Sequence, residues 1–239
     1  MRKKKFIKFI QPILIDFVML LAGILVALQI DDWRATIQTR KDEISILVNL
    51  NKELKSDLVI LEQNSQIHQQ SNHSLQVLLD HLQGDAPYHD SLESHFGWAT
   101  VMTFFINKSS SIATLNSVGV DLVSSHDLRN LIIKQYEVNY YFLKTTEGSY
   151  NDIIMLASTD LLNTRFEEFM NVDWFATPLP KVSMKPLNYE SLKTDVEFLY
   201  FIKTLNNQQK ALVIQPQVSS KAQLISLIKE IDAELVALK

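Results

Sequence analysis

The chain has 239 residues, 46% of them hydrophobic, so it can bury one core of ordinary size beyond any membrane segment. It contains no cysteine, which excludes disulfide bonds, thiolate metal sites and cysteine nucleophiles. Its five glycines and six prolines are few for this length, which favours long helices and predicts an all-α fold.

The first predicted element is a transmembrane helix over residues 13–30, in which Asp16 and Gln29 are the only residues that are neither apolar nor glycine. Its eighteen residues extend about 27 Å, close to the thickness of the hydrocarbon core of a bilayer. Five basic residues lie before it, in the flank 1–12, so the positive-inside rule puts the N-terminus in the cytoplasm. We expect a single-pass inner-membrane protein with a periplasmic domain over residues 31–239.

A cleavable signal peptide has the same order of charge and hydrophobicity. The apolar run is longer than the usual h-region and no A-x-A-like site precedes Asp31, so we interpret it as an uncleaved anchor. Five of the 23 basic and one of the 27 acidic residues lie before Asp31, which leaves 18 basic and 26 acidic residues beyond it. Such an acidic domain argues against nucleic acid as a partner, because phosphates bind basic surfaces.

Three residues of the predicted span define a face for a partner in the membrane. Asp16 lies about one turn from the basic end, where an acid is tolerated, or where it offers a polar contact to a second helix. Gly23 and Ala27 form a small-xxx-small pair, which lets helices approach closely but also occurs by chance. Besides the lipid bilayer, we therefore expect a second copy or another membrane protein as a partner.

The end of the span and the residues after it read GILVALQIDDW, from Gly23 to Trp33. This string resembles the GILIALQ and Asn-Asn-Trp signature of an uncharacterised family of single-pass membrane proteins from Gram-negative bacteria. The likeness continues at Asn107 to Ser109 and from Thr114 to Ile132, so it covers most of the first 170 residues. The resemblance implies a membrane anchor and no assigned activity. Asp31 and Asp32 stand where that family usually has asparagines, which adds negative charge there.

A seam of residues at alternating spacings of three and four runs from Ile44 to Leu82 and predicts one long helix that ends at Gly84. Four polar residues interrupt its apolar positions: Asn51, Ser65, His68 and Asn72. Buried polar residues in such a seam cost stability and tend to fix the register or the number of partners. The alternative is that they face a thin, hydrated part of a bundle.

Further helices follow, and we expect them to pack with the first as an elongated antiparallel bundle. They are a helix over residues 92–106, a short one that Ser109 to Ser111 cap and that ends at Gly119, a long one from about His126 to Phe169, one from Tyr189 to Val213, and a last one from Ser219 or Ser220 to Leu238. Prolines make residues 171–188 a loop. Pro216 interrupts the helix that begins at Tyr189. If the long second helix returns along the first, this loop lies near the bilayer.

The sequence offers no catalytic, cofactor or metal site. The six histidines, His68, His73, His81, His89, His95 and His126, are never three or four residues apart, the spacing at which two share one helix face. The glycines occur singly, so no phosphate-binding loop is present. Adjacent carboxylates such as Glu167 and Glu168 diverge around a helix, whereas general acid–base chemistry needs them to converge.

These patterns predict a membrane-anchored helical scaffold or accessory protein that acts by protein association rather than as an enzyme. The alternative is an extracytoplasmic ligand-sensing module that signals through a partner, and a closed pocket between helices would favour it. A pilin-like protein is disfavoured because no Gly-Phe processing site precedes Phe17.

Overall fold

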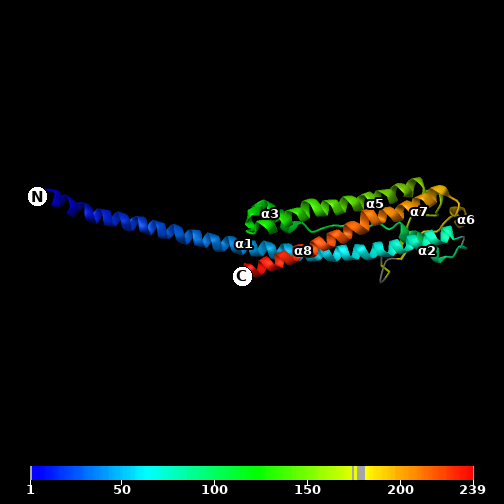
Figure 1. The fold of residues 1–239 in the computed structure, drawn as a ribbon, viewed down its shortest axis with the longest axis horizontal. Helices are drawn as coiled ribbons and strands as arrows, with labels where there is room; N and C mark the ends of the chain where they lie inside the picture. The colour runs from blue at the N-terminus through cyan, green and yellow to red at the C-terminus, as the bar shows by residue number, and fades with distance from the viewer. Residues whose placement is uncertain (1, 85, 174, 177–180, 239) are drawn as a thin grey trace.

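The longest element, α1 (Arg2–Gln83), is one continuous helix whose second half forms the spine of a helical bundle (Figure 1). The computed structural model describes residues 2–84, 86–173, 175–176 and 181–238, and for residues 2–16 and Val18 it describes the backbone alone. Every described side chain from Phe17 to Asp42 is exposed, and Glu43 is the first that is buried. The first half of α1 therefore projects beyond the bundle.

Within the residues whose side chains are described, no helix is long and apolar enough to cross a membrane. The flank 1–12, and residues 13–16 and Val18 of the predicted span, lie outside those residues. The span over residues 13–30 therefore stays a prediction.

The chain makes four passes along the bundle. The elements after α1 are α2 (Ser91–Ala99), an extended segment over residues 100–109, α3 (Ser110–Val118), a 3₁₀ turn (Val120–Leu122), α4 (His126–Lys134), a π-helical turn (Gln135–Asn139), α5 (Tyr140–Asp160), a 3₁₀ turn (Leu162–Thr164), β1 (Asn171–Asp173), β2 (Lys181–Ser183), α6 (Tyr189–Leu192), α7 (Val196–Gln209), a second π-helical turn (Lys210–Ile214) and α8 (Gln215–Ala237). A mostly helical fold is confirmed, and the pair of short strands is an addition to it.

The seam of α1 packs into the bundle as its spacing predicts. Leu47, Leu54, Leu61 and Leu75 are fully buried. The apolar core forms two main clusters, one that α1 enters from Ile46 to Leu61 and one that it enters from Leu75 to Leu82. Between them the buried residues of α1 are polar, so the bundle has an apolar half at each end and a polar stretch between the two.

The helix expected over residues 92–106 ends at Ala99 instead, and residues 100–109 run extended back along the bundle. The sequence there, VMTFFI, is rich in β-branched and aromatic residues, which favour extended backbone. Val101, Thr103 and Phe105 are buried, while Phe104 and Ile106 are exposed, the alternation of a strand. This segment, and not a helix, makes the second pass.

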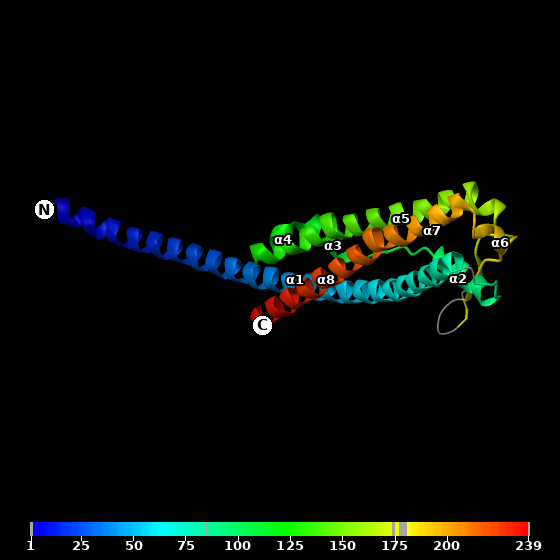
Figure 2. The same cartoon turned by 45° about the vertical axis from the view of Figure 1, so that its right-hand side comes forward.

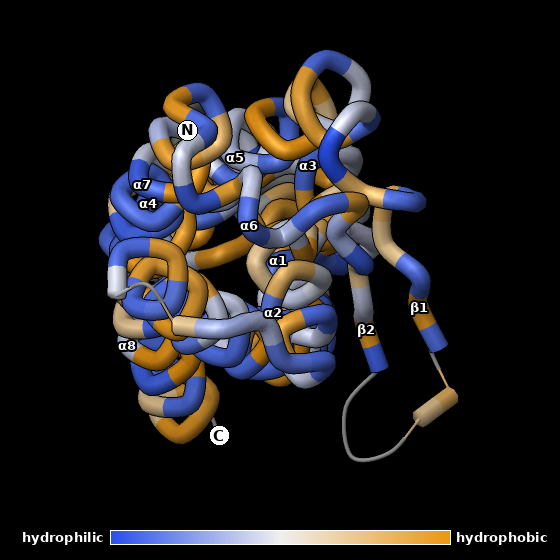
Figure 3. Tube along the Cα trace, turned by 90° about the vertical axis from the view of Figure 1, so that its right-hand side faces the viewer, coloured by the Kyte–Doolittle hydropathy of each residue, from blue (hydrophilic) through white to orange (hydrophobic). Residues whose placement is uncertain are grey.

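The described residues 171–173 and 181–188 lie at the far end of the bundle from the start of α1 (Figure 2). The expectation that the second long helix returns the chain to the end where the predicted span lies is therefore wrong. The reason is the extended pass: it makes α5 the third pass, which runs away from the N-terminus. Part of this loop forms a two-stranded antiparallel ribbon in which Val172 pairs with Val182. Figure 3 looks onto this distal end, where α2, α6 and both strands lie together.

Pro216 does not end a helix, contrary to expectation. The π-helical turn before it widens the helix, and the Gln215 N–H donates to the carbonyl of Lys210, five residues back. Pro216 brings no N–H of its own, and the wider turn makes room for a ring that clashes with a regular α-helix. The chain therefore continues from α7 through the π-helical turn into α8 without a break.

Gly97 of α2 packs directly against β2, and we expect Gly97→Ala to destabilise the protein by about 1–3 kcal/mol. A Cβ there would lie 2.7 Å from the Ser183 nitrogen and 2.8 Å from the Val182 carbonyl carbon, both backbone atoms. Denaturant unfolding followed by circular dichroism measures the loss. The matched control is Gly148→Ala, whose Cβ meets no atom within 4 Å and which should be neutral or stabilising. Equal stability of both variants would contradict the close contact.

Candidate functional site

The projecting part of α1 carries an uncovered apolar surface. Its exposed apolar side chains, at 37–70% exposure, are Phe17, Met19, Leu20, Leu21, Ile24, Leu25, Val26, Leu28, Ile30, Trp33 and Ile37. Because successive residues of a helix point about 100° apart, this run covers its whole circumference between Phe17 and Ile30. No single flat partner covers such a surface.

The predicted partner face lies on this same part of α1. The side chain of Asp16 lies outside the described residues. Ala27 is exposed, and a Cβ at Gly23 would meet nothing within 4 Å. Both positions are open to a second helix.

All four polar residues of the seam bind other parts of the same chain. The Asn51 amide donates to Asp232 over 2.9 Å, and the Ser65 hydroxyl donates to Gln217 over 3.0 Å. The His68 Nε2 lies 2.8 Å from the Thr103 hydroxyl, and the Asn72 amide donates to Asn206 over 3.3 Å. These contacts set the register of α1 against α7, α8 and the extended segment.

His68 belongs to a buried network that we call the polar layer. Its members are His68 and Ser71 of α1, Thr103 of the extended segment, Glu147, Tyr150 and Asn151 of α5, and Gln209 of α7. The Thr103 hydroxyl donates its one proton to Glu147, so it accepts from His68 Nε2, which fixes the tautomer of that ring. The Gln209 amide donates to Ser71 over 2.7 Å, and the rings of His68 and Tyr150 meet edge to face.

Burial sets the protonation states in this layer. Desolvation lowers the pKa of His68 to about 4, so the ring is neutral at pH 7. Its Nδ1 is buried, and the structure shows no hydrogen-bond partner for it. Desolvation likewise raises the pKa of the Tyr150 hydroxyl, an effect that Ser71 and Gln209 partly offset.

The buried carboxylates hold the extended segment in place. Glu147 accepts the Phe105 N–H over 2.6 Å, and Asn151 donates to the Thr103 carbonyl over 2.7 Å. Asp57 of α1 accepts the Lys108 N–H over 2.9 Å and the Tyr140 hydroxyl over 2.8 Å. Desolvation raises the pKa of Asp57, against the effect of those two donors. These side chains pair with backbone N–H and C=O groups of the segment, as a neighbouring strand does in a sheet.

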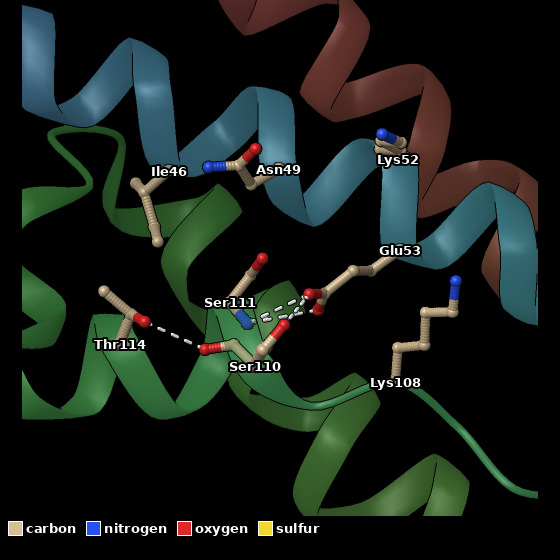
Figure 4. Close-up of a pocket in the computed structure, with 8 residues that line it drawn as sticks. All are labelled: Ile46, Asn49, Lys52, Glu53, Lys108, Ser110, Ser111 and Thr114. Carbon is tan, nitrogen blue, oxygen red and sulfur yellow. Dashed lines mark hydrogen bonds between the residues drawn. The ribbon is translucent and has the colours of Figure 1, made fainter.

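A pocket of about 410 Å³ opens between α1 and α3 (Figure 4). Glu53 lines it, and its carboxylate accepts from the Ser110 hydroxyl and from the Ser111 N–H at 3.2 Å. A carboxylate in this position caps the first turn of α3 and interacts favourably with its dipole. Lys52 and Lys108 also line the pocket, so its chemistry suits a small polar ligand.

The histidines do not assemble a metal site. Among the described residues no three His, Asp or Glu side chains are grouped to hold an ion. The rings of His73 and His95 approach to 6.0 Å edge to face, and His95 Nδ1 bonds to Ser74. This pair contributes to the packing of α2 on α1.

Of the polar layer, the sequence predicts His68 alone, and Ser71 and the members on the other elements are not among the predicted residues. Glu147, Tyr150 and Asn151 follow Leu143 at the helical spacing of a core face that continues to Ile154. A carboxylate at a core position of a predicted helix was therefore the available signal. The role of Thr103 had no such signal, since its stretch was expected to be helical.

One protein family matches the chain, described as "Family of unknown function (DUF6090)", over residues 16–166. The match takes in the chain from α1 through α5, including the extended segment, and leaves out α7 and α8. These residues include the segments 23–33, 107–109 and 114–132, which resemble an uncharacterised family of membrane proteins. No curated protein and no solved structure matches the chain.

We expect acidification to cost the protein stability through His68. Its folded pKa of about 4 lies below the ordinary 6.5, so between these values the unfolded chain binds a proton that the folded chain does not. The stability is complete above pH 6.5 and falls, by about 3 kcal/mol, as the pH drops toward 4. Denaturant unfolding at pH 7.5 and about pH 4.5 measures it.

The variant His68→Gln keeps a donor for Thr103 and should lose markedly less stability over that interval. The control is His126→Gln, at an exposed histidine. An equal acid loss in the wild type and in His68→Gln would contradict the assignment, because any contribution from His95 is common to both.

Proposed function

The chain belongs to DUF6090, a family of unknown function, and we propose that it is a membrane-anchored helical scaffold that acts by binding other proteins. In this proposal residues 13–30 span the inner membrane, residues 1–12 stay in the cytoplasm and the bundle lies in the periplasm. The observation that carries it is the uncovered apolar circumference of α1 from Phe17 to Ile30.

Lipid is the environment that suits this circumference. Leaving a large apolar side chain in water forgoes about 1.5–3 kcal/mol relative to burying it, and the run from Met19 to Ile30 has eight such side chains. A helix that is apolar all round is either enclosed in a protein core or surrounded by hydrocarbon. In the described structure the rest of the chain leaves this part of α1 uncovered, which supports the second alternative, that hydrocarbon surrounds it.

The next part of α1, Asp31–Asp42, forms a neck between the proposed span and the bundle. Its twelve residues extend about 18 Å. At the end of the neck, Arg40 donates to the carbonyls of Leu238, over 2.9 Å, and Ala237. The end of α8 is thus tied to the base of the bundle. Figure 1 shows α6 at the opposite end of the bundle from the start of α1, and in this proposal that end lies farthest from the bilayer.

The buried carboxylates of the bundle favour a role in protein binding over a role in catalysis. Asp57, Glu147 and Glu53 each accept hydrogen bonds from backbone N–H groups of this chain, which is work that holds the fold together. Asp57 and Glu147 are also buried. A carboxylate in general acid–base chemistry has to reach the proton that it transfers.

The pocket between α1 and α3 is the one observation that favours the second candidate, a ligand-sensing module. It has the size of a small-molecule site and polar groups on both helices. A small ligand that binds in this pocket should raise the thermal unfolding midpoint of the wild type. It should not raise the midpoint of the double variant that carries Lys52→Ala and Lys108→Ala.

For the proposed anchor, we expect the full-length chain to stay in the membrane pellet after an alkaline carbonate wash of bacterial membranes. Replacing Leu25 and Val26 by arginine should release it, because charges at the centre of a span cost about 2.5–3.5 kcal/mol each. The natural chain lacks cysteine, so single cysteines report topology. A membrane-impermeant maleimide should label Ser117→Cys in cells with a permeabilised outer membrane, and Lys4→Cys only after lysis. Recovery of the wild type in the soluble fraction would contradict the anchor.

For association within the membrane, we expect chemical crosslinking in native membranes to capture partner chains of the wild type. Asp16→Ala and Gly23→Leu should weaken this capture, because they remove a polar contact and a site of close approach. Leu25→Ile is the control, since residue 25 lies on the opposite side of the helix. Identical capture in all four proteins would exclude this face as the contact.

A further inference from the structure

Among the described residues, α5 and the neighbouring extended segment expose several large apolar side chains, and we call this surface the α5 face. It consists of exposed large side chains of α5 and of the neighbouring extended segment: Phe104 (65%), Ile106 (71%), Tyr141 (70%), Phe142 (57%), Met155 (50%) and Leu156 (64%). Single exposed apolar residues are ordinary on a protein surface, whereas a contiguous group of large ones marks a contact surface.

Helical spacing makes the α5 face continuous along its length. Tyr141, Gly148 and Met155 follow one another at intervals of seven residues, as do Phe142, Ser149 and Leu156. Residues seven apart lie nearly in line on one side of a helix. The face therefore consists of two parallel rows, apolar at both ends and small in the middle.

Hydrogen bonds place the extended segment beside the first row. Asn151 bonds to Thr103, Glu147 to Phe105, and Lys144 to Asn107 over 2.5 Å, so the segment runs antiparallel to α5. This register puts Phe104 and Ile106 next to the stretch of α5 around Gly148. A Cβ at Gly148 would meet no atom within 4 Å, so the surface is open there, and Phe104 and Ile106 are exposed.

The α5 face is large enough for a stable protein contact. Large side chains expose roughly 150–250 Å² each when free, so six of them at these exposures present on the order of 700 Å². A standard interface buries about 800 Å² on each partner. Burying the α5 face alone thus supplies most of one side of such an interface.

We propose that a second copy of this chain covers the α5 face, with a two-fold axis parallel to the long axis of the bundle. The proposal rests on the membrane anchor proposed above. Two chains whose α1 helices enter one bilayer in the same direction stand side by side and parallel, so that each residue near the axis meets its own counterpart. Gly148 and Ser149 let the two α5 helices approach closely there.

The geometry excludes the membrane as the cover of this face. The face consists of exposed side chains of α5 and the extended segment, and α5 runs lengthwise along the bundle opposite α1 (Figures 1 and 2). A bilayer entered by α1 lies across the long axis, beyond the neck. A neighbour anchored in that same bilayer reaches the side of the bundle, and the bilayer does not.

Asp152 is the residue by which the parallel arrangement can be recognised. It is exposed on α5 between the two rows of the face. In the parallel pair the two Asp152 carboxylates come together, and like charges there weaken association. In an antiparallel pair that crosses at Gly148 and Ser149, Asp152 instead meets Thr145. Removing the charge therefore strengthens only the parallel pair.

Cysteine crosslinking in native membranes tests the proposal, since the chain has no cysteine of its own. Under mild oxidation, Ser149→Cys should give a disulfide-linked dimer on a non-reducing gel. Ala222→Cys is the matched control, at an exposed position of α8 halfway along the bundle, and should stay monomeric. In the Ser149→Cys background, Phe142→Ser with Leu156→Ser should reduce the dimer at least fivefold, and Asp152→Asn should increase it.

Each outcome decides. Equal crosslinking of Ser149→Cys and Ala222→Cys means that chains crosslink by random collision, and it overturns the proposal. A Ser149→Cys chain that stays monomeric but remains in the membrane pellet also overturns it. In that last case the anchor stands and the dimer fails, whereas a soluble chain defeats the anchor. An unchanged dimer in Asp152→Asn overturns the parallel arrangement. Unfolding midpoints within about 2 °C of the Ser149→Cys parent show that the serine variants remain folded.

Discussion

An extended segment that runs through a helical bundle needs hydrogen-bond partners that helix backbones cannot offer, because their own N–H and C=O groups are already paired. Residues 100–109 meet this need with side chains: Asp57 and Glu147 accept N–H groups, and Asn151 donates to a carbonyl. The segment carries the chain back to the base of the bundle within ten residues. The direction of every later helix, and the distal position of β1 and β2, follow from this one pass.

The same contacts explain why the bundle keeps a polar layer between two apolar clusters. A neutral His68 bonded to Thr103, and Thr103 bonded to Glu147, satisfy one another where an apolar residue would leave the segment's donors without partners. Polar groups fixed in this way allow one register of α1 against the segment and α5. The layer therefore trades stability for a unique alignment of three long elements.

The sequence predicts the parts of this fold that repeat and misses the parts that depend on distant contacts. The spacing of leucines through α1 and the glycine after α3 are local signals, and they located those elements. The end of α2 at Ala99 was missed because the extended conformation of residues 100–109 depends on Asp57 and Glu147, which lie more than 40 residues away. Pro216 was read as a break because a π-helical turn has no local signature. In the site, Asn51, Ser65, His68 and Asn72 were recognised, but their partners on other elements were not.

The two surfaces proposed for contact cannot serve the same pair of chains. Between Gly23 and Gly84, α1 contains no glycine or proline, so it continues without a kink from the proposed span into the bundle. In a dimer joined through the α5 face, α1 lies behind the extended segment and α5 in each copy. With helix axes about 8–10 Å apart in each contact, the two α1 helices are separated by on the order of 20–30 Å. At that separation the two spans do not touch each other, so the predicted face at Gly23 and Ala27 is available to a different membrane protein. A chain with these two contacts links its own dimer to a second component.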